Sequence, residues 1–129
     1  MTTAITHPAV HRFEAPYSAA LRAGQLLFVS GTVAVDADGK LVGAGDLVAQ
    51  TRQALLNVQR LLEAAGGGFE HVAQLTYYLA DISQWAAAGP VRREFLSEPY
   101  PAGTAVEVSR LVNTDWLIEI DAIAVLPDD

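Results

Sequence analysis

The sequence predicts an α+β fold in which two helices pack on one face of a mostly antiparallel sheet. Three observations support this class. Strand-like apolar runs occur near both ends of the chain, one internal segment shows helical spacing and a second follows a helix-capping residue, and the strands come in runs mixed with these two helices. The chain has 129 residues, of which 51% are hydrophobic and 18% charged. We therefore expect one domain over residues 1–129 with a packed core, in which residues 1–12 are loosely held.

The first long strand is expected at residues 26–35, LLFVSGTVAV, which are mostly β-branched or apolar. Gly31 in its middle predicts a bulge or a close approach of another group to the backbone. Residues 36–39, DADG, are typical of a hairpin turn, and residues 40–45 are expected to form a short return strand. A further short strand is expected near Tyr17.

A helix is expected after Asp46, whose carboxylate suits the N-cap position. Apolar side chains and one threonine then recur at spacings of three and four, which places them in one stripe along a helix. The three glycines at positions 66–68 predict its end. The stripe consists of Val48, Thr51, Leu55, Val58, Leu62 and Ala65.

A strand and a second helix are expected next. Residues 71–80 alternate in the manner of a strand. Asp81 or Ser83 is expected to cap a helix that continues to about residue 96, and Pro90 is expected to bend or restart it. The alternation predicts one strand face with Val72, Gln74, Thr76 and Tyr78, and another with Ala73, Leu75, Tyr77 and Leu79.

The last two strands are expected at residues 104–111 and 116–126, so that Gly103 stands where the turn YPAG becomes a strand. In the final strand a period of two places Glu119 and Asp121 on one face, beside apolar residues of the same face. Partial burial raises the pKa of a carboxyl group and suits it to acid–base chemistry. The alternative interpretation is a solvated strand surface with ordinary charges.

Composition excludes several kinds of site. Cysteine is absent, which excludes disulfides, thiolate nucleophiles and Cys-ligated metals. The histidines at positions 7, 11 and 71 lack the spacing of a metal motif, so we expect no metal site, and neither a phosphate loop nor a dinucleotide fingerprint occurs. The N-terminus lacks the basic and apolar regions of a signal peptide, and no apolar run is long enough for a membrane span. We expect a cytoplasmic protein.

The charge balance speaks against nucleic acid as a partner. The formal net charge is −7, and the basic residues show no run beyond Arg92 and Arg93. Nucleic-acid-binding proteins usually present a basic face to the phosphate backbone. Nucleic acid is therefore not the expected partner.

Five segments, taken together and in order, resemble the reactive intermediate deaminase (Rid) family, also called YjgF or L-PSP endoribonuclease-like, over residues 16–125. The resemblance implies a chorismate-mutase-like α+β fold and a homotrimer with three pockets between adjacent subunits. It also implies hydrolysis of enamines and imines released by pyridoxal-phosphate enzymes, giving a keto acid and ammonia, without a metal or organic cofactor. The segments are APYSAALRAGQLLFVSG (15–31), QTRQALLNVQRLLEAAG (50–66), TYYLADISQW (76–85), YPAGTAVEVSRL (100–111) and IEIDAIAV (118–125).

The resemblance assigns roles to five residues of this chain. Glu119 matches the family's glutamate in the last strand, which positions or activates water. Tyr17 matches the tyrosine of the family's PYS motif, and Ser30 and Gly31 match the serine and glycine beside the pocket. Trp85 matches the aromatic residue that a neighbouring subunit contributes.

The chain departs from the family pattern at Gly103. The family's deaminases have an arginine there, which binds the substrate carboxylate, whereas Thr104 offers only a neutral hydroxyl and Ala105 matches a small residue. Gly89 replaces a frequent asparagine. We expect a wider pocket that is less selective for small imino acids. Four arginines are candidates to replace the missing one, and the spacing selects none of them: Arg12, Arg22, Arg92 and Arg93.

Three functions follow from these observations. The first is a divergent Rid hydrolase, in which Glu119 orients water but the specificity is altered by Gly103. The second is a trimeric small-molecule-binding protein without turnover, which the missing arginine favours. The third is the endoribonuclease of the family's older name, against which the acidic charge argues.

Overall fold

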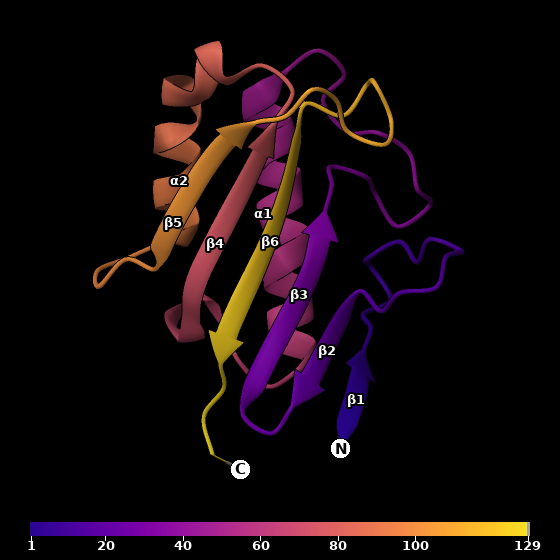
Figure 1. Ribbon diagram of the computed structural model, residues 1–129, viewed down its shortest axis with the longest axis vertical. Coiled ribbons are helices and arrows are strands. Elements are labelled where there is room, and N and C mark those ends of the chain that lie inside the picture. Colours follow the sequence, from indigo (N-terminus) through magenta and orange to yellow (C-terminus); the bar gives the residue numbers. More distant parts are fainter. Residues whose placement is uncertain (129) are drawn as a thin grey trace.

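The computed structural model describes residues 1–128. It contains a six-stranded sheet, two α-helices and two short 3-10 helices (Figure 1). In chain order these are β1 (Thr2–Ile5), β2 (Ala20–Ala23), β3 (Leu26–Thr32), α1 (Leu47–Ala64), η1 (Phe69–His71), β4 (Val72–Leu79), η2 (Ile82–Ala88), α2 (Gly89–Phe95), β5 (Ala102–Glu107) and β6 (Ile118–Val125).

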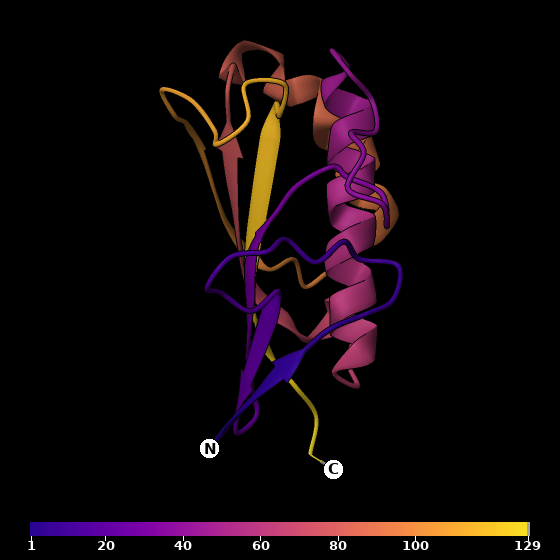
Figure 2. The same cartoon turned by 90° about the vertical axis from the view of Figure 1, so that its right-hand side faces the viewer.

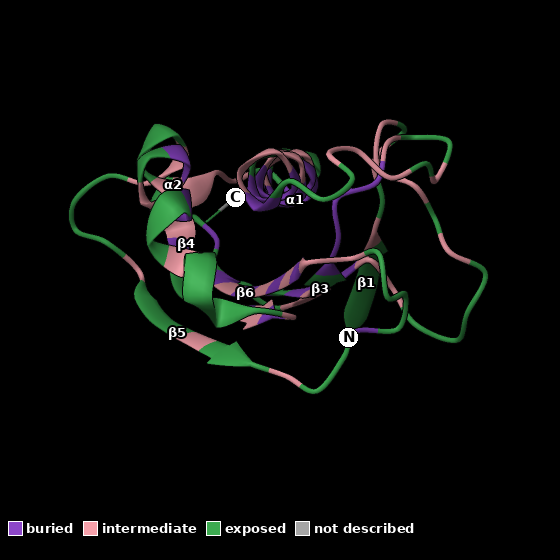
Figure 3. Cartoon of the chain, turned by 90° about the horizontal axis from the view of Figure 1, so that it is seen from above, coloured by how far each residue is buried: buried purple, intermediate pink, exposed green. Residues whose placement is uncertain are grey.

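The strands lie in the order β1-β2-β3-β6-β4-β5. All neighbours are antiparallel except β4 and β5, which are parallel, and the last strand of the chain lies at the centre of the sheet (Figure 1). Both α-helices lie on one face of this sheet, and no helix of residues 1–128 covers the other face (Figures 2 and 3). The predicted α+β class is confirmed.

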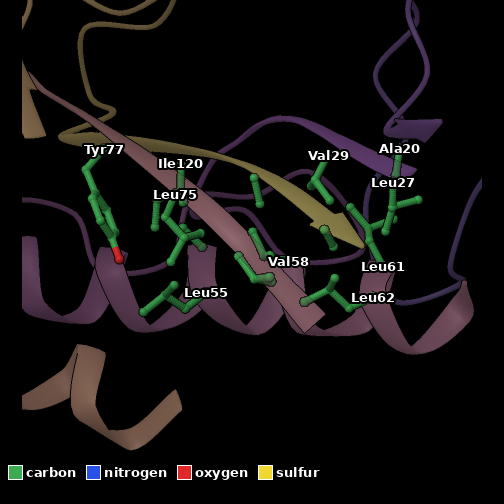
Figure 4. Packing of buried hydrophobic residues seen from close by; sticks show 14 of the residues in the cluster. Ala20, Leu27, Val29, Leu55, Val58, Leu61, Leu62, Leu75, Tyr77 and Ile120 are labelled. Atoms are coloured by element: carbon green, nitrogen blue, oxygen red, sulfur yellow. The ribbon is translucent and has the colours of Figure 1, made fainter. Parts of the chain in front are cut away.

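The core lies between the sheet and α1. Residues of β6 alternate along the strand, with Ile118, Ile120, Ala122 and Ala124 buried and facing the helices. Figure 4 shows aliphatic side chains of β3, β4 and α1 meeting in this layer. Each fully buried aliphatic side chain contributes about 1.5–3 kcal/mol relative to an exposed one.

The helix α1 begins where its sequence predicts, and the predicted stripe is buried except at Val48, which is only partly buried while Leu47 is buried. The side chain of Asp46 accepts a hydrogen bond from the backbone N–H of Ala49 at 3.0 Å. Its buried polar residues connect the helix to loops. The Asn57 amide donates to the carbonyls of Val33 and Val35 at 3.1 and 2.9 Å. The Gln50 side chain accepts from the Leu117 N–H at 2.8 Å. These bonds fix two loops that border the candidate site.

Two predictions about the first half of the chain differ from the structure. β3 ends at Thr32 rather than at residue 35, and its pairing with β6 shifts between Val29 and Thr32, which is the bulge that Gly31 predicts. The expected return strand is wrong, because only a single bridge between Val35 and Leu41 follows the turn at residues 36–39.

The segment 81–96 contains a 3-10 helix and then α2 rather than one helix. Asp81 caps η2 by accepting from the Ser83 N–H at 3.0 Å. α2 starts at Gly89, with Pro90 in its first turn, so the restart expected at this proline is confirmed.

Two expectations about the strands of the second half are wrong. Val72 is buried although its predicted face is the one of Gln74, because the β4 pairing shifts between these two residues. β5 spans Ala102–Glu107 rather than 104–111, so Gly103 lies inside the strand, opposite Leu75 of β4.

The N-terminal part also forms strands. Within residues 1–12, which were expected to be loosely held, Thr2–Ile5 pair with β2. The short strand expected near Tyr17 lies at Ala20–Ala23. No helix among residues 1–128 is long and apolar enough to span a membrane.

Candidate functional site

A cleft of about 430 Å³ brings together four of the residues singled out in the sequence. Tyr17, Ser30, Gly31 and Glu119 all line it, although they come from the loop before β2, from β3 and from β6. We call this the Glu119 cleft. Its remaining lining residues are Phe13, Glu14, Ala15, Val33, Val112 and Trp116.

Gly31 is a glycine because the Glu119 side chain lies directly over its backbone. A Cβ built at position 31 would overlap the carboxylate of Glu119. The backbone of Gly31 does not have a positive φ, so close approach rather than conformation requires the glycine. The bulge in β3 therefore creates the space in which Glu119 lies, and any other residue would displace it.

Ser30 holds the loop that carries Tyr17. Its hydroxyl donates to the Ser18 carbonyl at 2.6 Å, and its backbone N–H donates to the Ala19 carbonyl at 2.9 Å. These bonds fix residues 18 and 19 against β3 and so place the adjacent Tyr17 beside Glu119. Because its hydroxyl proton is used inside the protein, Ser30 positions the wall of the cleft.

The cleft raises the pKa of both Glu119 and Tyr17. For Glu119 the larger cause is burial and the smaller is the negative charge of Asp121. For Tyr17 burial comes first and the charge of Glu119 second. Asp121 itself accepts a hydrogen bond of 2.9 Å from the Tyr78 hydroxyl. A carboxyl group with a raised pKa exchanges protons more readily near neutral pH, which is the property that a general acid or base needs.

Two aromatic side chains, Phe13 and Trp116, form one wall of the cleft. Their rings contact each other edge to face, with 5.9 Å between centroids. His11 packs on Phe13 in the same way at 4.7 Å. Nothing in the local pattern of residues 11–17 signals this contact, since the loop reaches Trp116 only through the tertiary fold.

Gly103 lines a second cleft, of about 230 Å³, between β4, α2 and the start of β5. We call this the Gly103 cleft. Arg92 and Arg93 of α2 line it as well, so Gly103 shares this cleft with two cationic side chains. The residues next to Gly103 in the sequence give no sign of these cations. The other lining residues are Leu75, Tyr77, Gly89, Leu96, Tyr100, Pro101 and Ala102.

Neither the backbone nor the packing requires a glycine at position 103. Its φ is not positive, and a Cβ there would meet only the Leu75 carbonyl oxygen, at the ordinary contact distance of 3.9 Å. A side chain at this position would extend into the Gly103 cleft. The residue therefore keeps open a space that other side chains are able to fill.

The other predicted site residues are distributed around β5 and η2. Ala105 lies opposite Tyr77 and packs against the core, whereas Thr104 lies opposite Thr76 and is exposed. Trp85 of η2 does not line the Glu119 cleft. Its ring packs on Tyr77, with 4.8 Å between centroids.

The two clefts lie on opposite faces of the sheet. Gly103 is opposite Leu75, which faces the helices, whereas Glu119 is opposite Tyr78, on the face that no helix covers. They have no lining residue in common. Residues 1–128 contain no group of three or more His, Cys, Asp or Glu side chains arranged to hold a metal ion.

Comparison with known proteins gives consistent matches over nearly the whole chain. The family model described as Endoribonuclease L-PSP matches residues 9–126. A RutC family protein of Pyrococcus horikoshii is 45% identical over 84% of this chain and 86% of its own length. A goat (Capra hircus) protein named 2-iminobutanoate/2-iminopropanoate deaminase is 37% identical over 85% of this chain and 80% of its own.

A solved structure agrees with these sequence matches. The crystal structure of Escherichia coli TdcF with bound serine superposes with a TM-score of 0.88 and 29% identity, over 97% of this chain and 99% of that one. The sheet order, the helix layer and the matched residues thus point to one family. The chain belongs to the Rid family, also known as YjgF, which the Endoribonuclease L-PSP model describes.

Proposed function

We propose that this protein is a Rid-type deaminase that hydrolyses the C–N bond of a small reactive imine or enamine. The observation that carries the proposal is the half-buried Glu119 carboxyl, which lies over Gly31 in the Glu119 cleft and has a raised pKa. A related protein named 2-iminobutanoate/2-iminopropanoate deaminase supports the reaction class.

In the proposed reaction, Glu119 moves protons between water and substrate. The carboxylate accepts a proton from a water molecule as the water oxygen bonds to the imine carbon. The nitrogen takes up this proton, which gives a carbinolamine. Glu119 then moves the hydroxyl proton of the carbinolamine to the nitrogen, the C–N bond breaks as the C=O bond forms, and the products are a ketone and ammonia. An enamine first gains a proton on carbon and becomes the imine. The steps are redox-neutral, and the raised pKa makes each transfer by Glu119 less costly near neutral pH.

We propose further that the site is shared between copies in a homotrimer. Four apolar residues on the sheet face without helices are 38–48% exposed, namely Leu26, Phe28, Val106 and Val125. Exposed apolar groups gathered on one face favour contact with another protein surface. The two clefts of one chain lie on opposite faces of its sheet, so they meet only between copies. In the proposed arrangement the edge strand β5, which carries Gly103, lies against the helix-free face of the neighbouring copy, beside the Glu119 cleft of that neighbour.

The specificity is proposed to differ from that of family members with an arginine at position 103. Gly103 leaves space in the cleft, so we expect larger imines to be accepted. The test uses 2-iminopropanoate and the bulkier imine of phenylalanine, each generated in the assay by an amino-acid oxidase and trapped by semicarbazide. A deaminase lowers the yield of semicarbazone. A clear preference for the small imine would contradict the altered specificity.

The role of Glu119 is tested with the variant Glu119→Gln in the same assay. We expect the rate to fall by about 10²–10⁴-fold, because a general acid–base group contributes about that factor. Glu63→Gln, the same substitution at an exposed position of α1, is the control. Unchanged turnover in Glu119→Gln would show that the carboxyl has no catalytic role.

The alternative of a binding protein without turnover is favoured by the absence of a cation at position 103 itself. It predicts that keto acids raise the melting temperature while no imine is hydrolysed. Ribonuclease activity is disfavoured by the net charge of −7, and salt-sensitive binding of RNA would revive it.

A further inference from the structure

The Gly103 cleft is cationic in a chain that is acidic. Arg92 and Arg93 both line it, and none of its described lining residues is Asp or Glu. The net charge of the whole chain is −7. The acidic residue of α2, Glu94, is paired with Arg52 of α1 at 2.7 Å and does not line the cleft. The positive charge of the cleft is therefore not neutralised locally.

Arg92 is held in place by aromatic rings. Its guanidinium carbon lies 4.3 Å from the centroid of the Trp85 ring and 5.4 Å from that of Tyr77. Tyr77 extends from β4 toward the helices (Figure 4). Stacking on aromatic faces favours a guanidinium over an ammonium and restricts its rotamers. Arg93 is exposed and has no comparable ring contact among the described residues.

The hydrogen-bonding capacity of Arg92 is incompletely used. Its Nε is buried and, among residues 1–128, is the only buried side-chain nitrogen or oxygen without a hydrogen-bond partner. No carboxylate of the described residues pairs with it. The Arg92 side chain makes a hydrogen bond to Tyr77, and its Nε remains without a partner. Because buried polar atoms are nearly always satisfied, the hydrogen bonding of this guanidinium is not completed by the described residues.

We propose that Arg92 is the specificity-determining residue that binds the carboxylate of an anionic substrate in the Gly103 cleft. Gly103 leaves the approach to the guanidinium open, and Leu75, Leu96 and Pro101 supply apolar walls for the body of the ligand. The preferred ligand is thus a small organic carboxylate with an apolar side chain. As a statement about the substrate the inference rests on the proposed deaminase function, whereas the carboxylate site itself is testable without turnover.

The experiment measures equilibrium binding by calorimetry, with 2-oxobutanoate as the anionic probe and its neutral amide as the matched probe. We expect Arg92→Met to weaken 2-oxobutanoate binding by about 100-fold, because a bidentate charge-assisted contact is lost. Arg92→Lys keeps the positive charge but loses the two parallel N–H donors of the guanidinium, and we expect the affinity for 2-oxobutanoate to fall about tenfold. Binding of the amide should change by less than about threefold in both, which a merely structural role of Arg92 would not produce.

Arg60→Met is the control, since it removes the same charge from α1 at a residue that lines neither cleft. If Arg92→Met does not fold, the ratio of anion to amide binding in Arg92→Lys decides. The inference is overturned if the parent protein does not prefer the anion, if the variants lose amide and anion binding equally, or if Arg93→Met causes the same loss as Arg92→Met.

Imine turnover by the same variants separates this inference from the proposed function. Selective loss of 2-oxobutanoate binding in a protein that hydrolyses no imine would refute the deaminase and retain the carboxylate site. Turnover that is insensitive to Arg92→Met, together with unchanged binding, would refute the role of Arg92 and retain the deaminase.

Discussion

Gly31 and Gly103 each line a cleft of this protein, but for opposite physical reasons. At Gly31 the space above the backbone is occupied by the Glu119 carboxylate, so a side chain there would have to displace that carboxylate. At Gly103 the nearest atom to an added Cβ is the Leu75 carbonyl oxygen at 3.9 Å, so a side chain fits. The glycine at position 31 keeps Glu119 in place, and the glycine at position 103 keeps a volume open. Position 103 is therefore the one of the two at which the fold accepts other side chains, so its residue is able to differ between proteins that bind different ligands.

The most direct test of this difference is to make the same substitution at both positions. Gly31→Ala should displace Glu119 and lower imine turnover by about 100-fold or more, because small misplacements of a reacting group cost about that much. It should also destabilise the fold by about 1 kcal/mol through crowding. Gly103→Ala should leave turnover within about threefold and stabilise the strand by up to about 1 kcal/mol. Steady-state assays and urea unfolding measure both effects. Equal losses in the two variants would refute the distinction.

A second substitution sharpens the comparison by filling the open space. Gly103→Arg adds a guanidinium to the cleft that Arg92 lines. In an Arg92→Met background we expect it to restore 2-oxobutanoate binding by about tenfold, since a new fork compensates for the lost one. The double variant and both single variants are compared by calorimetry. Gly103→Ala in the same background is the control, and rescue by alanine would show that volume rather than charge is responsible.

The sequence predicts the fold class and the position of Glu119 because both depend on local periodicity. A period of two in β6 is sufficient to place Glu119 and Asp121 on the face opposite Ile118 and Ile120, as the structure has them. The glycine in β3 likewise predicts a bulge, and the register of β3 on β6 contains one. Each of these features depends only on residues that are close together in the sequence.

Other features depend on contacts between distant segments and are not visible in the sequence. The boundaries of β5 follow from its parallel pairing with β4, which no local pattern encodes, so the local pattern predicts a start two residues too late. The selection of Arg92 among four arginines depends on how α2 restarts at Gly89 and on the rings of Trp85 and Tyr77. Phe13 reaches the Glu119 cleft through the same kind of long-range contact.

The smallest expected effect is on folding stability, because an ionised Glu119 in its cleft lowers the free energy of unfolding. Burial, and secondarily Asp121, raises the pKa of Glu119 in the folded protein. A carboxyl group of this kind favours folding when it is protonated. Its contribution is fully present below the unfolded pKa, about 4.3, and is lost as the pH rises through the higher folded pKa. Glutamine stays neutral throughout, so Glu119→Gln should melt at a higher temperature than the parent near pH 7.5, by a margin that shrinks toward pH 4.

Thermal unfolding of both proteins across this range measures the margin, with Glu63→Gln on the exposed surface of α1 as the control. A difference that does not vary with pH would place its origin in packing rather than in the charge. A difference that grows as the pH rises would show that the space opened by Gly31 holds an ion at a cost to stability. The Gly103 cleft carries no such carboxylate, so Gly103→Ala should shift the melting temperature by the same amount at every pH.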